Sequence, residues 1–226
     1  MNPVNLSIII PVLNEGPTIA AFLQALAPLR ARGVQVIVVD GGSQDNSLAQ
    51  AIPLVDHALV GPQGRARQMN AGADLAQGKV LMFLHADTQR PDAADALVLT
   101  AVDAGALWGR FDVHIEGHSP ALRVVARMMN LRSRLSGIAT GDQAIFVRRE
   151  VFEAVGKFPD QALMEDIELS KSLRRLALPA CLRARVRTSG RRWESRGVWR
   201  TIVLMWSLRW RYWLGASPEH LARVYR

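Results

Sequence analysis

Apolar residues in this chain fall into short continuous runs separated by stretches with helical spacing. Three runs are rich in Val, Ile and Leu and too short for helices, so they predict strands buried on both faces: 6–13, 34–40 and 80–84. A shorter strand is predicted near 57–60. The intervening spacing predicts helices from Pro17 to just before Gly33, over about 44–51 with Ser43 as N-cap, and over about 65–76.

The periodicity changes after about residue 105. The stretch 107–117 alternates apolar Phe111, Val113 and Ile115 with polar residues such as Arg110, which predicts a half-exposed, antiparallel strand. A helix over about 120–135, a strand over 143–149 and a helix over 162–177 follow. Buried strands alternating with helices indicate an α/β fold, with a doubly wound, mostly parallel sheet and a small antiparallel part.

Polar residues follow three of the buried runs at the point where each strand ends. They are Asn14-Glu15, the Asp40–Ser43 turn, and His85-Ala86-Asp87. Because doubly wound sheets bind ligands in the crevice at the carboxyl ends of their strands, these groups are expected to converge on one site.

Composition limits the architecture to one sizeable core. The chain has 226 residues, 49% of them hydrophobic, and its single cysteine, Cys181, rules out an internal disulfide. We expect a catalytic domain over 1–190 and a C-terminal helical extension over 191–226. Neither a signal peptide nor a membrane-spanning run is evident, so a cytoplasmic protein is expected, with peripheral membrane contact left open.

The positive charge is concentrated near the C-terminus. Residues 1–173 carry 15 Lys and Arg against 18 Asp and Glu, whereas residues 174–226 carry 13 arginines against two acids. This asymmetry favours an anionic partner, although a bias towards Arg on solvated surfaces would also produce it.

The strand-end residues suit phosphate chemistry but lack the common nucleotide motifs. There is no GxGxxG after the first strand and no GxxxxGK[ST] in the chain. Arg65 and Arg67 lie near a helix start, where phosphate binds well, and Asp87 suits a hard divalent cation bridging a diphosphate.

Six ordered motifs resemble those of glycosyltransferase family 2, an inverting family with the GT-A fold: PVLNE (11–15), VVDGGSQDNS (38–47), GRARQMNAG (64–72), LHAD (84–87), TGDQAIFVRRE (140–150) and MEDIEL (164–169). The resemblance spans roughly 5–176. It implies transfer of a sugar from a UDP-sugar, with Asp166 as general base beside Glu165, and Asp87 as ligand of Mg²⁺ or Mn²⁺. The residues it implies for nucleotide-sugar binding are Pro11, Val12, Leu13, Asn14, Glu15, Asp40, Gly41, Gly42, Ser43, Arg65, Arg67, Asn70, His85, Ala86 and Asp87.

One position departs from the family pattern. His85 replaces the first aspartate of the family's Asp-x-Asp, which leaves the identity of the cation, and dependence on it, open. An imidazole there could ligate Mn²⁺, bind the ribose or contact the diphosphate.

The chain most resembles a small subgroup associated with selenium genes, which includes the selenosugar synthase of selenoneine biosynthesis. That resemblance implies a hexosyltransferase using selenophosphate, or another anionic acceptor, bound by Gly141, Asp142, Gln143, Arg191, Arg192 and Trp193. The alternative is a hydroxyl acceptor, a lipid or small molecule, at a membrane surface.

Several of these residues also have purely structural interpretations. Asn14 and Asp40 could cap helices, Glu165 and Asp166 could complement a helix dipole, Asp142 could be a turn residue, and His85 could be a satisfied structural histidine.

The segment 194–214 interleaves Trp and Leu with Arg over a predicted helix. Packing against the catalytic domain, homodimerisation and peripheral membrane contact all suit this pattern. No nucleic-acid partner is expected, because no sequence-reading motif accompanies the arginines.

Overall fold

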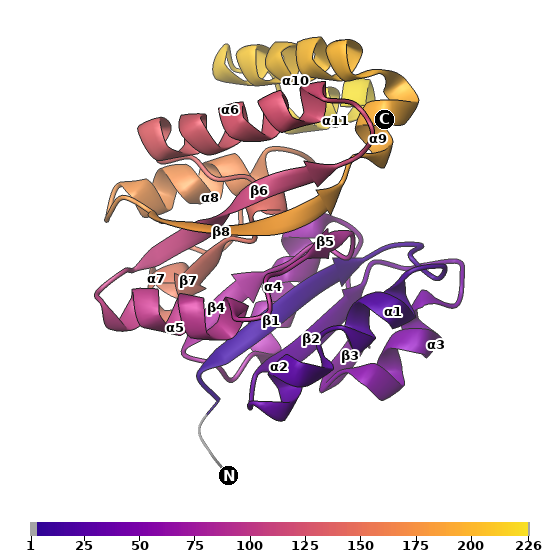
Figure 1. The fold of residues 1–226 in the computed structure, drawn as a ribbon, viewed down its shortest axis with the longest axis vertical. Helices are drawn as coiled ribbons and strands as arrows, with labels where there is room; N and C mark the ends of the chain where they lie inside the picture. The colour runs from indigo at the N-terminus through magenta and orange to yellow at the C-terminus, as the bar shows by residue number, and fades with distance from the viewer. Residues whose placement is uncertain (1–3, 226) are drawn as a thin grey trace.

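A single mixed sheet organises the protein. The computed structural model describes residues 4–225, apart from the side chain of Arg192. Within them, eight strands form one sheet in the order β3-β2-β1-β4-β7-β6-β8-β5 (Figure 1). The predicted α/β fold, mostly parallel with an antiparallel part, is confirmed.

The first four strands of the chain form the parallel part of the sheet. Its strands are β1 (Leu6–Val12), β2 (Gln35–Asp40), β3 (His57–Val60) and β4 (Val80–Phe83). Val12 pairs with Asp40, and Asp40 pairs with Val60, so these three strands end at the same level. This alignment brings the residues after the strands to one edge, as the sequence predicted.

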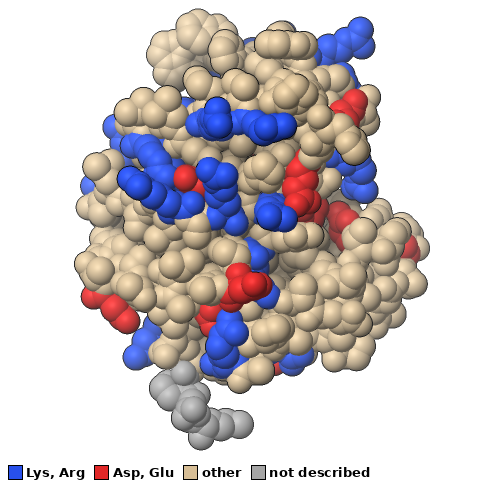
Figure 2. Space-filling view, viewed as in Figure 1, with Lys and Arg blue, Asp and Glu red and all other residues tan. Residues whose placement is uncertain are grey.

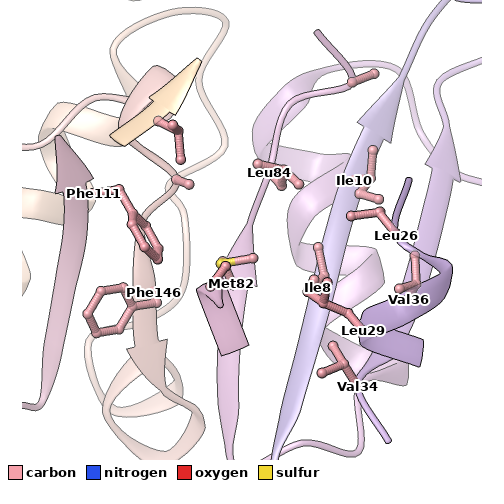
Figure 3. Packing of buried hydrophobic residues seen from close by; sticks show 14 of the residues in the cluster. Ile8, Ile10, Leu26, Leu29, Val34, Val36, Met82, Leu84, Phe111 and Phe146 are labelled. Carbon is pink, nitrogen blue, oxygen red and sulfur yellow. The ribbon is translucent and has the colours of Figure 1, made fainter. Parts of the chain in front are cut away.

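Alternate residues of each central strand enter two separate hydrophobic layers. Ile8 and Ile10 of β1 pack with Leu26 and Leu29 on one face (Figure 3), whereas Ile9 packs with the helix after β3 on the other. Because both faces are covered, these strands are apolar at nearly every position.

The helices around the parallel part differ from the prediction in two places. The helices are α1 (Ile19–Gln24), α2 (Ala27–Ala31), α3 (Ser47–Ala51), the 3-10 helix η1 (Ile52–Leu54) and α4 (Arg65–Leu75). The single helix expected between Pro17 and Gly33 is two helices, because Pro28 has no N–H to continue the first. The helix expected at 44–51 begins at Ser47 instead.

The antiparallel part lies beyond β4. It consists of β7 (Phe146–Arg148), β6 (Trp108–Glu116), β8 (Ala180–Ser189) and β5 (Thr88–Gln89). β7 is shorter than the predicted strand over 143–149, because Gly141–Gln143 forms the 3-10 helix η2 and Arg149 starts a helix. β6 is antiparallel to β7, as predicted, but parallel to β8, a strand that the sequence analysis missed.

Arg110 of β6 does not face solvent as the alternating pattern suggested. Its side chain is fully buried, where Nε donates to Ser133 Oγ at 3.1 Å and a terminal nitrogen donates to the Asn130 carbonyl at 3.1 Å. An ion pair with Asp112 compensates the buried charge.

The remaining helices are α5 (Ala94–Asp103), α6 (Ala121–Ser136), α7 (Arg149–Ala154), α8 (Glu165–Arg174), α9 (Arg191–Arg196), α10 (Val198–Trp213) and α11 (Pro218–Tyr225). The predicted helix over 194–214 is divided at Gly197, whose φ is +84°. Leu208 of α10 and Leu221 of α11 pack against Ile167 of α8 in a cluster of their own. No helix within residues 4–225 is long and apolar enough to cross a membrane.

Candidate active site

A cavity of about 790 Å³ opens at the carboxyl ends of β1 and β4. It receives residues from six parts of the chain: Pro11, Val12, Leu13, Glu15, Gln63, Gly64, Arg65, Ala66, Arg67, Gln68, His85, Ala86, Asp87, Asp160, Gln161, Ala162, Leu163, Arg196, Glu219, Ala222 and Tyr225. Nine of the residues assigned to nucleotide-sugar binding from sequence line it.

Asp40 and Asn14 build the support beneath this cavity. The carboxylate of Asp40 is 2% exposed and accepts the N–H groups of Gly42 at 3.0 Å and Ser43 at 2.8 Å. Asn14 accepts the N–H of Gln44 at 2.8 Å and donates its own N–H to Ser43 Oγ at 2.8 Å. These bonds tie the turn after β2 to the loop after β1. Ser43 therefore serves that turn and does not cap α3.

Gly41 follows the same turn and allows a close contact. A side chain at this position would place its Cβ 2.9 Å from the amide of Gln68. That amide donates to the carbonyls of Val12 at 2.9 Å and Val39 at 2.8 Å, locking α4 to the ends of β1 and β2. Asn14, Asp40, Gly41, Gly42 and Ser43 thus fix the shape of the crevice without lining the cavity.

Two carboxylates, Glu15 and Asp87, lie close together in the cavity wall. Burial raises the pKa of Glu15 above its usual range, and the negative charge of Asp87 raises it further. A cation bound beside Glu15 would favour the ionised form of this carboxyl and so oppose both effects. No cluster of three or more His, Cys, Asp or Glu side chains suited to a metal occurs among residues 4–225.

His85 connects the end of β4 to η2. Its Nδ1 lies 3.6 Å from Asp142 Oδ1. Burial of the imidazole by itself lowers its pKa, but the carboxylate of Asp142 outweighs that effect, and the pKa of His85 is raised. Gly141 lies against the ring, so closely that an added Cβ would be 2.5 Å from His85 Cε1.

Asp166 lies at the start of α8, directly beside η2. One carboxylate oxygen accepts the N–H of Gly141 at 2.9 Å and the other accepts the N–H of Ile167 at 2.7 Å. Burial, followed by the charge of Glu165, raises the pKa of Asp166 to about 6. The group is thus ionised at neutral pH and yet a much better proton acceptor than an ordinary aspartate.

Arg65 joins this acidic pair to the cavity. Its Nε lies 3.1 Å from Glu165 Oε1, and Glu165 is 3% exposed. The second oxygen of Glu165 has no hydrogen-bond partner among the described residues. Arg67, on the same helix turn, pairs with Asp160 at 2.6 Å. Each guanidinium lines the cavity and has further N–H groups with which to bind an anion.

Some residues that the sequence analysis assigned to binding have structural roles instead. The amide of Asn70 donates to the carbonyl of Phe158 at 2.8 Å and accepts its N–H at 3.1 Å, so it faces away from the cavity. Gln143 is fully buried and forms a capping box with Thr140. Trp193 packs on the main hydrophobic core.

Arg191 and Arg192 precede Trp193 in the chain. Arg191 is exposed, and its charge is near enough to Glu15 to lower the pKa of that carboxyl in part. The side chain of Arg192 lies outside the described part of the structure.

The sequence analysis missed the far wall of the cavity. Asp160–Leu163 and the C-terminal residues Arg196, Glu219, Ala222 and Tyr225 contribute to it. Arg196 donates to the carbonyl of Tyr225 at 2.8 Å, which ties α9 to the end of α11. The amphipathic pattern of 218–225 is the one signal that could have indicated a docked helix.

The chain is similar to known proteins in sequence and in fold. A protein named PGL/p-HBAD biosynthesis glycosyltransferase from Mycobacterium tuberculosis is 32% identical over 171 residues, covering 67% of this chain and 62% of that protein. The chain therefore spans less than two thirds of the length of that relative.

Two solved structures share the fold. TarS 1-349 from S. aureus, in complex with UDP-GlcNAc, superposes with a TM-score of 0.66 at 16% identity, covering 82% of this chain and 58% of that one. The mannosyltransferase PcManGT from Pyrobaculum calidifontis, in complex with GDP-Man and Mn²⁺, gives a TM-score of 0.60 at 21% identity, covering 81% and 56%. Both likenesses support the GT-A architecture.

The family model described as Glycosyl transferase family 2 matches residues 7–156, which is more than half of the chain. That match includes the crevice loops, α4 and the His85–Asp87 segment. The chain belongs to glycosyltransferase family 2.

Proposed function

We propose that this protein transfers a sugar from a UDP-sugar to an acceptor with inversion at the anomeric carbon. The observation that carries the proposal is that acidic side chains and arginines line one cavity, with a carboxyl group of raised pKa, Asp166, close to them. Glu15, Asp87, Arg65 and Arg67 line it. Asp166 is connected to two lining residues, to His85 through Gly141 and to Arg65 through the neighbouring Glu165. One side provides charge for a diphosphate and the other a group that accepts a proton.

The donor would lie along the edge of the parallel strands. Arg65 and Arg67 would bind the diphosphate through N–H groups not used by Glu165 and Asp160. The backbone of Pro11–Leu13 would face the nucleoside, held in place by the Asn14–Ser43 and Asp40 bonds beneath it.

A divalent cation fits the acidic side of this cavity. Hard cations such as Mg²⁺ take one or two carboxylates together with substrate phosphates, and Glu15 and Asp87 supply such a pair. Asp87 would be the principal ligand. A cation there would neutralise charge on the diphosphate leaving group. PcManGT, with its bound Mn²⁺, provides a precedent within the fold.

Asp166 would act as general base. A hydroxyl acceptor is protonated at neutral pH, so its attack requires a positioned group that removes the proton. The pKa of about 6 suits that role, because Asp166 is ionised at pH 7 and still binds a proton strongly. Glu165 would act on Asp166 through its charge, and would hold Arg65 towards the donor.

A hydroxyl acceptor, a lipid or small molecule, is the acceptor that this base supports best. The name of the mycobacterial relative places that protein in PGL/p-HBAD biosynthesis. Selenophosphate is the second candidate, favoured by Arg191 and Arg196 near the cavity. Arg148 and Arg149, the arginines of the TGDQAIFVRRE motif, are occupied elsewhere, because they donate to backbone carbonyls of Val102, Ala106 and Gly78.

The test is a panel of UDP-sugars incubated with the protein, with hydroxyl acceptors or with selenophosphate, and UDP release followed by mass spectrometry. Asp166→Asn separates the acceptors. Loss of turnover with a hydroxyl acceptor supports the base, whereas retained selenosugar synthesis would favour selenophosphate, an anion that needs no proton removed. No UDP release with any pair would contradict the proposal.

A further inference from the structure

The outward face of α10 is an uncovered aromatic stripe. Trp199, Trp206, Trp210 and Trp213 are 75%, 73%, 61% and 73% exposed, and Val203 between them is 66% exposed. At about 100° per residue, these five positions fall within an arc of roughly 80°. The opposite face of α10, with Thr201 and Leu208, is buried.

Arginines flank this stripe on both sides. By the same helical geometry, Arg200 and Arg211 lie on one side and Arg209 on the other. No acidic residue occurs between 195 and 218. The stripe is therefore apolar at its centre and cationic at its margins, as in helices that lie in a membrane interface.

α6 repeats the arrangement next to α10. Val124, Met128, Leu131 and Leu135 recur at helical spacing and are all at least half exposed, and the four charged residues of this helix are arginines. Figure 1 shows the two helices side by side at one end of the molecule. Contacts at both ends of α6 agree: His118 N–H donates to Glu194 Oε1 at 2.5 Å, and Ile138 packs in the cluster of Leu208.

β8 extends the positive charge below α6. Arg183, Arg185 and Arg187 alternate along its exposed face, and the strand contains no acidic residue. Figure 2 shows lysine and arginine side chains gathered across the part of this face formed by α6 and β8, with a surface above them that is mostly free of charged side chains. The aromatic stripe and the basic band thus lie at the same end of the molecule.

We propose that the α6–α10 end of the molecule docks onto an anionic lipid bilayer. Indole rings settle at the boundary between headgroups and acyl chains, and arginines at the margins reach anionic headgroups. A second copy of this chain fits less well, because a symmetric contact would bring the same arginines face to face. Nucleic acid also fits less well, because the aliphatic stripe of α6 has no rings on which bases could stack.

Docking in this way would place the cavity beside the bilayer. α10 leads directly into α11, whose Glu219, Ala222 and Tyr225 line the cavity. The docking surface contains none of the groups assigned to the donor or the base. The proposal can therefore fail while the proposed function holds, and the reverse is also true.

The test is sedimentation of the whole protein with vesicles of phosphatidylcholine alone or of phosphatidylcholine with phosphatidylglycerol. Binding should require phosphatidylglycerol and should weaken with added salt. Trp206→Glu and Trp210→Glu should reduce binding at least about ten-fold, whereas Ile52→Glu, at another exposed apolar residue away from this end, should not. Arg211→Glu should cost about thirty-fold, whereas the matched charge reversal Lys79→Glu should cost little.

UDP binding, measured in parallel, should be unchanged in all of these variants, which also shows that they fold. Three outcomes would overturn the proposal. The first is that the wild type does not sediment with phosphatidylglycerol vesicles, and the second is that Trp206→Glu binds them as tightly as the wild type does. The third outcome is that Ile52→Glu weakens vesicle binding as much as Trp206→Glu does. A dimer in light scattering that Trp206→Glu dissolves, without vesicle binding, would assign the face to a second copy. Tighter binding to single-stranded RNA than to vesicles would assign it to nucleic acid.

Discussion

The carboxylate of Asp166 accepts the backbone N–H of Gly141 at 2.9 Å, while Gly141 itself lies against the ring of His85. This contact joins the start of α8, the η2 turn and the end of β4 in one assembly. The group proposed as base is thereby held in a fixed position relative to the residues that face the donor.

Asp166→Asn should lower kcat by about 10²–10⁴-fold with a hydroxyl acceptor, because an amide cannot accept the proton. In the wild type, kcat/KM should rise with pH up to about 6 and then level off, because the ionised carboxylate is the active form. Steady-state rates between pH 5 and 8 would measure this. A flat profile through pH 6 would exclude Asp166 as the titrating base.

The same raised pKa should affect stability. The folded pKa of about 6 exceeds the reference value of 3.8, so the protonated carboxyl stabilises the fold below pH 4 and that contribution is lost as pH rises through 6. The stability of wild type relative to Asp166→Asn should therefore fall by about 2 kcal/mol between pH 4 and pH 7. Urea unfolding of both proteins at several pH values would measure it. A constant difference would mean that the pKa of Asp166 is unperturbed.

Gly141→Ala should impair turnover by displacing His85. The added Cβ would meet the imidazole at 2.5 Å, well inside van der Waals contact, so the ring or the turn must move. We expect a loss of stability of about 1–3 kcal/mol together with reduced kcat. In the background of His85→Ala the same change should cost much less. Equal costs in the two backgrounds would show that the contact with the ring is unimportant.

α11 offers a test of the cavity wall that the sequence analysis missed. Leu221 is fully buried between α10 and α8, so Leu221→Ala should destabilise the docked helix by about 2–4 kcal/mol. Because α11 lines the cavity, UDP affinity should fall roughly ten-fold, which corresponds to about 1.4 kcal/mol. His220→Ala, at the exposed neighbour, is the control. Unchanged UDP affinity in Leu221→Ala would mean that α11 does not shape the donor site.

The sequence predicted the parallel part of the fold well, for a physical reason. Strands buried on both faces have continuous apolar runs, and their polar ends meet at one edge because Val12, Asp40 and Val60 are in register. Elements with mixed composition were harder to predict. β8 alternates arginines with small and apolar residues, so it resembled part of a basic tail.

The structural roles of single polar residues were also hidden from the sequence. Arg110 is buried because Ser133 and Asn130 of α6 meet its donors, and Asn70 is occupied by the backbone of Phe158. Both depend on contacts between residues distant in the chain. The same is true of Glu219 and Tyr225, which reach the cavity only because α11 folds back onto α8.

The predicted boundary between a catalytic domain at 1–190 and an extension at 191–226 remains a proposal. β8 ends at Ser189 within the sheet and α9 begins at Arg191, which agrees with that division. However, α11 contributes to the cavity wall, so the extension and the catalytic domain would act together.

The central claim is that the cavity binds a nucleotide sugar through its acidic and basic walls. Calorimetric titration of UDP in the presence of Mg²⁺ or Mn²⁺ tests it most directly, with Asp87→Asn as the test variant. The control is Asp74→Asn, which makes the same charge change at an exposed residue that pairs with Lys157 outside the cavity. We predict saturable UDP binding by wild type and Asp74→Asn, and binding at least about ten-fold weaker in Asp87→Asn. Absence of UDP binding by the wild type, or equal affinity in both variants, would contradict the account.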